Sequence, residues 1–325
     1  MNVAIIGCGL IGEKRARALS GHRLVATADT DLERAKKVAR LGGCSISYED
    51  WKAAAAHPEA DIIIVATTNN WLTPVGRYAL EHGKHVLIEK PGARSAEELK
   101  PFLELARKAG PKVKVGFNLR FHPAMLKARE IIDSGVMGEL MFIRGRYGHG
   151  GRAGYNKEWR ADKAISGGGE LLDQGVHLID LARWYLGDFE RVTGWAPTCY
   201  WDMPVDDNGF MALRTARAQM AWLHASCTEW KNMFCLEIYG LTGKLQIDGL
   251  GGSYGEERLT FYRMLPEMGP PETTAWNYPG ADKSWEVEFS AFIDAIKTGK
   301  PLCGDLEDAY KALSVVGEIY RSDLK

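Results

Sequence analysis

The first 118 residues alternate between short apolar runs and helical segments, and this alternation constrains the fold more than any other feature. The apolar runs are 2–7 (NVAIIG), 23–29, 44–48, 60–67, 85–90 and 112–118. The segments between them are 12–21, 31–43, 49–56, 73–83 and 95–110, which read as helices. Repeated strand–helix units predict a doubly wound parallel sheet of the Rossmann type.

After about residue 120 the alternation stops and a different pattern begins. A predicted helix at 122–135 is followed by a strand at 139–148, and several short strands separated by turns occupy 189–265. Two amphipathic helices are predicted near the end, at 284–299 and 306–322. We therefore expect an α/β chain with two domains. Residues 1–120 form the Rossmann domain, and 121–325 form an α+β domain built on an open, mainly antiparallel sheet, whose C-terminal helices pack back on the first domain.

Composition excludes several classes of function. The 325 residues carry a net charge of −1, so no basic excess attracts nucleic acid or anionic lipid. The six cysteines are scattered without a CxxC pair, which predicts no metal site and no disulfide framework, and favours the cytoplasm. The chain has no run of 18 apolar residues, and its apolar start lacks a basic flank, so we expect no membrane span and no signal peptide.

The motif GCGLIG, residues 7–12, follows a predicted strand and precedes a predicted helix, as in a dinucleotide-binding loop. Gly7 permits the tight turn, Gly9 lets a pyrophosphate approach the backbone, and Gly12 lets helix and strand pack closely. Leu10 and Ile11 complete the predicted cofactor-binding loop at the positive end of the helix. The alternative is a glycine-rich turn that serves packing only.

Asp29 ends the second strand, where a carboxylate can accept hydrogen bonds from ribose hydroxyls and repel a 2′-phosphate. This favours NAD over NADP. The alternative role is a helix cap, for which Asp31 is a second candidate. Thr67 and Asn69 follow the strand at 60–67 at the edge where ligands bind, although ordinary turn chemistry also explains them.

The segment 167–184 (GGGELLDQGVHLIDLARW) reads as a helix after a flexible entry, with Asp173 and His177 four residues apart on one face. The alternative is a solvated polar stripe made of Glu170, Asp173, Gln174, His177, Asp180 and Arg183. The segment 85–95 (HVLIEKPGARS) places Glu89 and Lys90 at a strand end beside the predicted cofactor edge. Glu89 is a predicted cofactor contact, and Lys90 is suited to polarising a substrate oxygen.

Four segments together resemble the glucose–fructose oxidoreductase / inositol dehydrogenase (Gfo/Idh/MocA) family. They are VAIIGCGLIG at 3–12, GKHVLIEKP at 83–91, VGFNLRFHP at 115–123 and GGGELLDQGVHLIDL at 167–181. The resemblance covers essentially the whole chain. It implies a Rossmann domain plus an α/β domain with an open sheet that often serves subunit association, and chemistry on a ring hydroxyl or ketone of a sugar, inositol or nucleotide sugar.

The resemblance also implies roles for individual residues. Lys90 is similar to the catalytic lysine, Asp173 to the acid that orients the substrate, and His177 to the proton-exchanging acid/base, because an imidazole exchanges protons near neutrality. One position departs from the family, which often has a histidine shortly after the fourth strand, where this chain has Leu72. That departure affects local contacts rather than the reaction class.

Weaker candidates for substrate contact are Asn118, Arg120, Tyr147, Trp159, Arg160 and Trp230. Arg120 suits a phosphate or carboxylate, or else a structural salt bridge. Tyr147 and Trp159 suit the C–H face of a sugar, or else core packing. Asp206 and Asp207 are explained by turn chemistry alone.

These observations predict a cytoplasmic NAD-dependent dehydrogenase or reductase acting on a sugar, with a weak preference for a nucleotide sugar. Through its open sheet, the resemblance also implies a homodimer or homotetramer. Two alternatives stay open: redox-neutral glycoside cleavage with NAD recycled in the site, and a dinucleotide-binding sensor without turnover. The particular sugar, its ring carbon and the direction of reaction are not specified by the sequence.

Overall fold

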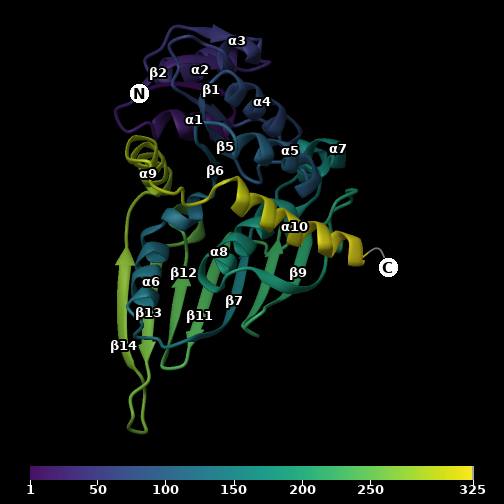
Figure 1. Cartoon of the computed structure of the whole chain (residues 1–325). Coiled ribbons are helices and arrows are strands. Elements are labelled where there is room, and N and C mark those ends of the chain that lie inside the picture. The colour runs from purple at the N-terminus through teal and green to yellow at the C-terminus, as the bar shows by residue number, and fades with distance from the viewer. Residues whose placement is uncertain (324–325) are drawn as a thin grey trace. The chain divides into compact units, whose positions relative to one another are not determined.

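The computed structural model describes residues 1–323, which form two compact units (Figure 1). Unit 1 contains Met1–Asn118, Ala164–Gly167 and Trp285–Tyr310. Unit 2 contains Leu119–Lys163, Gly168–Ser284 and the chain from Lys311 onward. Each unit is therefore assembled from segments that are distant in sequence, and each is described by itself.

Unit 1 is built on a six-stranded parallel sheet. Its strands, in the order β3-β2-β1-β4-β5-β6, are β1 (Asn2–Ile6), β2 (Arg23–Ala28), β3 (Ser47–Tyr48), β4 (Ile62–Val65), β5 (His85–Glu89) and β6 (Val113–Gly116). Strand order reverses between β1 and β4, and in such sheets ligands bind outside the carboxyl ends of the strands at that reversal. The predicted doubly wound sheet is confirmed.

The helices of unit 1 begin and end close to the predicted positions, with one correction. They are α1 (Leu10–Arg17), α2 (Leu32–Leu41), α3 (Trp51–Ala55), α4 (Asn69–Glu81) and α5 (Ala96–Ala106). The helix predicted at 73–83 begins earlier, at Asn69 after an extended Thr68, so Pro74 lies inside α4 and not in its first turn. Proline removes one hydrogen bond there but does not prevent the helix from starting earlier.

The segment Trp285–Tyr310 completes unit 1. It contains most of α9 (Ser284–Thr298), whose Phe289, Phe292 and Ile293 belong to the hydrophobic cluster beneath β1, β4 and β5. Further along, the backbone N–H of Val115 in β6 donates to the carbonyl of Gly304 (3.0 Å). Burial of apolar side chains and pairing with the sheet edge thus join a late segment to the first sheet.

Unit 2 is built on an eight-stranded sheet in the order β14-β13-β12-β11-β7-β10-β9-β8. Its strands are β7 (Leu140–Gly148), β8 (Phe189–Trp195), β9 (Asn208–Thr215), β10 (Met220–Ser226), β11 (Met233–Gly240), β12 (Gly243–Asp248), β13 (Glu257–Arg263) and β14 (Glu272–Tyr278). Only the β7–β10 pairing is parallel among the described strand pairs of this sheet, so the mainly antiparallel sheet is confirmed.

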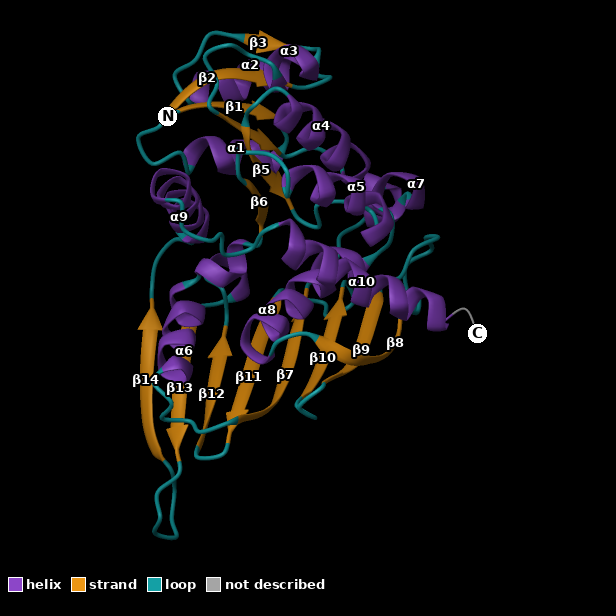
Figure 2. Cartoon of the chain, viewed as in Figure 1, coloured by secondary structure: helices purple, strands orange, loops and turns teal. Residues whose placement is uncertain are grey.

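Helices cover one face of this sheet. Figure 2 shows α6 (Pro123–Asp133) and α8 (Val176–Leu186) against it, and α10 (Leu306–Asp323) contributes its part from Lys311 onward. Shorter elements are α7 (Lys163–Ser166), a π-helical turn at Leu171–Gly175, and 3-10 turns at Asn118–Phe121, Tyr155–Lys157, Trp159–Ala161 and Gly252–Tyr254. The π-helical turn leads directly into α8, so the predicted helix at 167–184 has an irregular first turn.

Candidate functional site

The glycine loop of unit 1 contains two positions where only glycine fits. Gly7 has φ +90°, and a Cβ there would stand 2.4 Å from a backbone oxygen just after β4. A Cβ on Gly12 would stand 2.1 Å from the carbonyl oxygen of Gly7, whereas Gly9 faces open space. Leu10 is exposed and Ile11 is half-buried at the start of α1. Turn and packing reasons therefore explain two glycines, and binding of a pyrophosphate at Gly9 stays a prediction.

Asp29 lies directly against this loop. Its Oδ2 accepts the backbone N–H of Cys8 (2.7 Å) and its Oδ1 accepts that of Asp31 (2.9 Å). The capping role belongs to Asp31, whose carboxylate accepts the backbone N–H of Glu33 (3.0 Å) at the start of α2. Asp29 remains half-buried beside the glycine loop, where a ribose would be expected.

The residues after β4 make contacts within unit 1. Thr67 is half-buried, and its hydroxyl donates to the carbonyl of Thr68 (3.2 Å). The amide of buried Asn69 donates to the carbonyl of Ser166 (2.8 Å). Leu72, which stands where the family often has a histidine, is a buried core residue of α4. Cofactor contacts by Thr67 and Asn69 stay predictions.

A short turn presents Lys90 after β5. The backbone N–H of Gly92 donates to the carbonyl of Glu89 (3.0 Å), and the Lys90–Pro91 peptide bond between them is cis. Lys90 is half-buried. Glu89 is buried, and its Oε1 accepts a hydrogen bond from Nε of Arg15 (2.6 Å). The Glu89 carboxylate therefore has an ion-pair partner inside the unit, and its predicted contact with a cofactor stays untested.

In unit 2, the polar stripe on the helix after Gly169 is not solvated. Glu170, His177, Asp180 and Arg183 are between 1% and 7% exposed, and Asp173 is half-buried in the π-helical turn. Burying this many polar groups is costly unless they are satisfied by partners, so the alternative of an ordinary solvated face is wrong.

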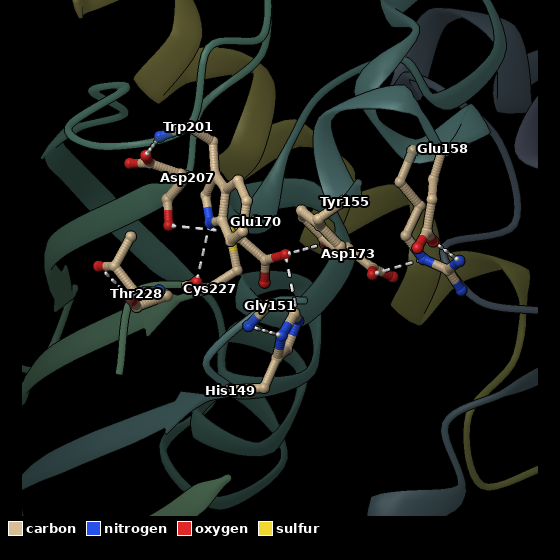
Figure 3. Close-up of polar contacts among 12 residues, drawn as sticks. His149, Gly151, Tyr155, Glu158, Glu170, Asp173, Trp201, Asp207, Cys227 and Thr228 are labelled. Atoms are coloured by element: carbon tan, nitrogen blue, oxygen red, sulfur yellow. Dashed lines mark hydrogen bonds and ion pairs between the residues drawn. The ribbon is translucent and has the colours of Figure 1, made fainter. Parts of the chain in front are cut away.

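Arg160, a predicted substrate contact, bonds Asp173 and packs against Trp159, a second predicted contact. Its Nε donates to Oδ2 of Asp173 (3.2 Å), which is labelled in Figure 3. Its guanidinium lies 4.6 Å from the ring centroid of Trp159. Nη1 of Arg160 also lies 3.8 Å from the Glu158 carboxylate. Burial alone would lower the pKa of Arg160, but the charge and hydrogen bond of Asp173, together with Tyr155 and Glu158, outweigh burial and raise the pKa. Asp173, Arg160 and Trp159 thus form one local group, and their contact with a substrate stays a prediction.

Tyr147, at the end of β7, packs against His177. The two rings meet edge to face with centroids 6.0 Å apart, and Tyr147 makes a similar contact with Phe234 (5.4 Å). Burial raises the pKa of Tyr147 well above its usual value. The packing alternative for Tyr147 therefore holds, and the same contact fixes one side of the His177 ring.

A network around Glu170 was missed by sequence reasoning. Oε1 of this buried carboxylate accepts the hydroxyl of Tyr155 (2.6 Å) and lies 3.4 Å from Nε2 of His149 (Figure 3). Nδ1 of His149 accepts the backbone N–H of Gly151 (3.0 Å), so the neutral ring carries its proton on Nε2, facing Glu170. Burial lowers the pKa of His149, but its hydrogen bond to Glu170 and the charge of that carboxylate raise it overall.

Asp206 anchors the start of the helix that carries Asp173. Its carboxylate accepts the backbone N–H groups of Gly169 (2.9 Å) and Leu171 (2.7 Å) and the hydroxyl of Tyr320 (2.7 Å). Burial raises the pKa of Asp206 to about 6. Turn chemistry therefore does not account for this residue, which joins three separate segments of unit 2.

Asp207 organises the neighbouring loop. It accepts three consecutive backbone N–H groups at 199–201, at 2.7, 2.7 and 2.9 Å. The pKa of Asp207 is lowered because these bonds outweigh its burial. Trp230 is exposed, has φ +57°, and contacts the Tyr200 ring edge to face at 4.8 Å. Its predicted contact with substrate stays untested.

Arg120 has the structural role that was its alternative. Nε and Nη2 donate to the two carboxylate oxygens of Asp180 at 2.8 and 2.6 Å, and both side chains are buried. Asn118 is buried in the 3-10 turn that follows β6. The ion pair accounts for Arg120, and direct contact of either residue with a substrate stays untested.

Within residues 1–323, no three His, Cys, Asp or Glu side chains are grouped as a metal site. No described helix combines the length and the apolar character needed to cross a membrane.

Comparison with known proteins identifies both parts of the chain. Residues 1–117 match the oxidoreductase family model with an NAD-binding Rossmann fold, and residues 125–246 match the GFO/IDH/MocA C-terminal domain. Levoglucosan dehydrogenase of Pseudarthrobacter phenanthrenivorans is 32% identical over 67% of this chain, a stretch that spans 59% of that enzyme. D-glucoside 3-dehydrogenase of Escherichia coli is 26% identical over 99% of this chain and 95% of its own length.

A solved structure of levoglucosan dehydrogenase in complex with NADH shares the fold. Its TM-score is 0.92 at 24% identity, and the match covers 100% of this chain and 97% of that one.

Proposed function

Because this chain belongs to the GFO/IDH/MocA family of oxidoreductases, we propose that it is an NAD-dependent sugar dehydrogenase or reductase. The observation that carries the proposal is the buried polar stripe around His177, with Asp173 held half-buried beside Arg160. Burying such a stripe costs free energy that a helix serving only packing would avoid. Asp173, His177 and the neighbouring Arg160 supply the acid, base and cation that proton transfer on a hydroxyl requires.

The proposed roles follow from the chemistry of each side chain. When bound, the nicotinamide accepts or returns a hydride at C4. His177 takes the hydroxyl proton as the alcohol becomes a ketone, and returns it in the reverse direction. Asp173 accepts a hydrogen bond from a sugar hydroxyl and orients the ring. Lys90 holds positive charge toward the oxygen that develops alkoxide character.

Asp29 supports NAD rather than NADP. Its carboxylate is half-buried and held by the Cys8 N–H beside the glycine loop. From there it accepts bonds from the ribose hydroxyls, and its negative charge repels a 2′-phosphate. Gly9 leaves the space that a pyrophosphate needs above the start of α1.

We propose an uncharged sugar as substrate, in place of the nucleotide sugar that the sequence weakly favoured. Three carboxylates, Glu158, Glu170 and Asp173, balance the charges of Arg152, Arg160 and His149, so the surroundings of Asp173 do not offer a net positive charge to a phosphate. Two relatives named for their substrates, levoglucosan and D-glucoside dehydrogenases, agree with this choice. We also propose a cytoplasmic location, which the scattered cysteines support.

We also propose that a second copy of the chain covers the open face of the unit 2 sheet, giving a homodimer or homotetramer. Neighbouring strands β8, β9 and β10 expose Trp195, Phe210, Met220 and Trp222, which are between 36% and 58% exposed. An apolar group of this kind on a flat sheet is typical of an association surface. Sedimentation of the purified protein would show one concentration-independent oligomer, and a monomer would reject this part.

The test of the function uses His177→Ala and the exposed-residue control His82→Ala, each assayed by NADH absorbance against a panel of sugars. We expect His177→Ala to lose about 10²–10⁴-fold in kcat, the usual contribution of a general base, while NADH binding followed by fluorescence is retained. His82→Ala should match the wild type. Undiminished turnover of His177→Ala would reject the role. Sugar release without net NADH would identify redox-neutral glycoside cleavage instead, and bound NAD without turnover would identify a sensor.

A further inference from the structure

Four charged side chains are buried together in unit 1. They are Arg15 of α1, Glu89 of β5, Lys114 of β6 and Glu288 of α9, with side chains between 0% and 8% exposed. Nε of Arg15 donates to Glu89 (2.6 Å), Nη1 of Arg15 donates to Glu288 (2.7 Å), and Nζ of Lys114 lies 3.4 Å from Glu288. Two cations thus face two anions. Each comes from a different element, and α9 is far from the other three in sequence.

A buried cluster of charges is weak evidence for a role in stability. Removing several charges from water costs free energy, and apolar side chains of similar size often stabilise a core equally well or better. The adjacent core already contains Phe289 and Phe292 of the same helix. Because the cluster includes Glu89, the residue before Lys90, we infer that it fixes the position of the turn that carries Lys90.

The geometry centres on the guanidinium of Arg15. Glu89 and Glu288 bind it in its plane, and the Trp285 ring packs on it with a centroid 4.4 Å from Cζ. On a further side, a Cβ added to Gly116 would stand 2.7 Å from Nη2. Arg15 is therefore confined by ion pairs, an aromatic face and the backbone of β6, and α9 supplies two of these contacts.

Arg15 in turn confines the turn that carries Lys90. The side chain of Glu89 is held by Arg15, and its carbonyl is held by the N–H of Gly92 (3.0 Å). Lys90 follows Glu89 directly and lies within the turn that the Glu89–Gly92 bond closes. Arg15 also belongs to α1, which begins at Leu10 immediately after Gly9 of the glycine loop. One guanidinium thus connects α9, the Lys90 turn and the helix after the predicted cofactor loop.

We propose that Glu288 is a positioning residue for Lys90, acting through Arg15 and Glu89. The inference rests on the proposed function, in which Lys90 contacts the reacting oxygen. Small displacements of a group at the reacting centre cost large factors in rate without a matching loss of binding. Loss of the Glu288–Arg15 contact should therefore lower kcat and leave KM nearly unchanged.

The first experiment compares Glu288→Gln with Glu307→Gln. Glu307 pairs with Arg107 (2.5 Å) at a partly exposed position and anchors the same C-terminal segment, so it is the matched control. We expect Glu288→Gln to lower kcat at least tenfold, on the order expected for a misplaced catalytic group, with KM and NADH affinity changed less than about twofold. Glu307→Gln should equal the wild type. Wild-type kcat in folded Glu288→Gln, or an equal loss in Glu307→Gln, would overturn the proposal.

A charge-balanced variant covers the case in which Glu288→Gln does not fold. Lys114→Met combined with Glu288→Leu removes one cation and one anion and fills the space with apolar atoms, so the fold should be kept. Arg15 keeps the Trp285 ring but still loses its ion pair with α9, and kcat should again fall at least about tenfold. Recovery of wild-type kcat in this variant would overturn the proposal.

A readout without turnover separates this inference from the proposed function. Acetylation of Lys90 by a small reagent, followed by peptide mass spectrometry, reports the surroundings of its amine whether or not a sugar is oxidised. We expect the Lys90 rate to change at least threefold in Glu288→Gln and not in Glu307→Gln. An unchanged rate would overturn the positioning role, whereas a wild type that oxidises no sugar would reject only the proposed function.

Discussion

Replacing Arg120 with methionine removes a guanidinium that donates two hydrogen bonds to Asp180, at 2.8 and 2.6 Å. The two side chains are only 3% and 1% exposed, so water cannot take over as the partner of the remaining carboxylate. Breaking a buried ion pair by removing one member costs about 3–5 kcal/mol, because an uncompensated charge stays behind. We expect the free energy of unfolding of Arg120→Met to fall by that amount.

Urea unfolding followed by circular dichroism measures this loss, with the m-value reporting whether the transition keeps its character. Arg263→Met is the matched control, because Arg263 of β13 pairs with Glu272 of β14 (3.8 Å), both side chains are more than half exposed, and such pairs contribute up to about 1 kcal/mol. Arg120→Met combined with Asp180→Leu removes both charges. That variant should recover to within about 1 kcal/mol of the wild type.

Two results would refute the reasoning. A loss below about 1 kcal/mol in Arg120→Met would mean that the ion pair contributes no more than a surface pair does. A sugar KM raised at least about tenfold, which corresponds to about 1.4 kcal/mol of binding, together with unchanged stability would mean that Arg120 binds substrate, as the sequence suggested.

The pKa of Asp206, raised from 3.8 to about 6 by burial, means that the fold favours the protonated acid. That stabilisation is full well below pH 3.8 and is lost as pH rises through about 6, so the unfolding free energy of the wild type, relative to Asp206→Asn, should fall by about 2.5 kcal/mol between pH 4 and 7 in urea titrations. A flat difference would show that the backbone N–H groups keep the carboxylate ionised. In the glycine loop, Gly12→Ala should unfold unit 1 at lower temperature in thermal scans because its Cβ meets the Gly7 carbonyl. Gly9→Ala should leave the melting temperature unchanged but weaken NADH binding measured by fluorescence, and equal NADH affinity would contradict the predicted pyrophosphate position.

Patterns that span a few residues were predictable, because they reflect local geometry. Gly7 and Gly12 were assigned to a tight turn and a close packing contact, and the backbone leaves no room for a Cβ at either. The sequence also named Asp29 and Asp31 as candidates for the cap of α2, and Asp31 is the cap. Local patterns fail to predict a strand that has no buried face, because such a strand shows no alternation of apolar and polar residues. β14 (Glu272–Tyr278) was missed because most of its residues are exposed and lack the alternation of a half-buried strand.

The candidate site was predictable in its residue types but not in its partners. Asp173, Arg160 and Trp159 were each named as candidates, and they contact one another. Glu170 was seen only as a member of a polar stripe. Its carboxylate accepts the hydroxyl of Tyr155, which belongs to a segment without regular pattern, and no spacing in the sequence indicates that bond.

The sequence by itself determined the two sheets, the glycine loop and the helix that carries Asp173 and His177, because periodicity and turn chemistry act over neighbouring residues. The tertiary structure decided which charges meet. Arg120 and Asp180 are 60 residues apart, and Arg15 and Glu288 are 273 apart. An isolated charged residue has the same local signature whether it faces water or a buried partner. Only the packing of distant segments removes the water and selects the partner. In this protein it places the polar stripe and a scattered set of charges in buried networks beside the proposed site residues.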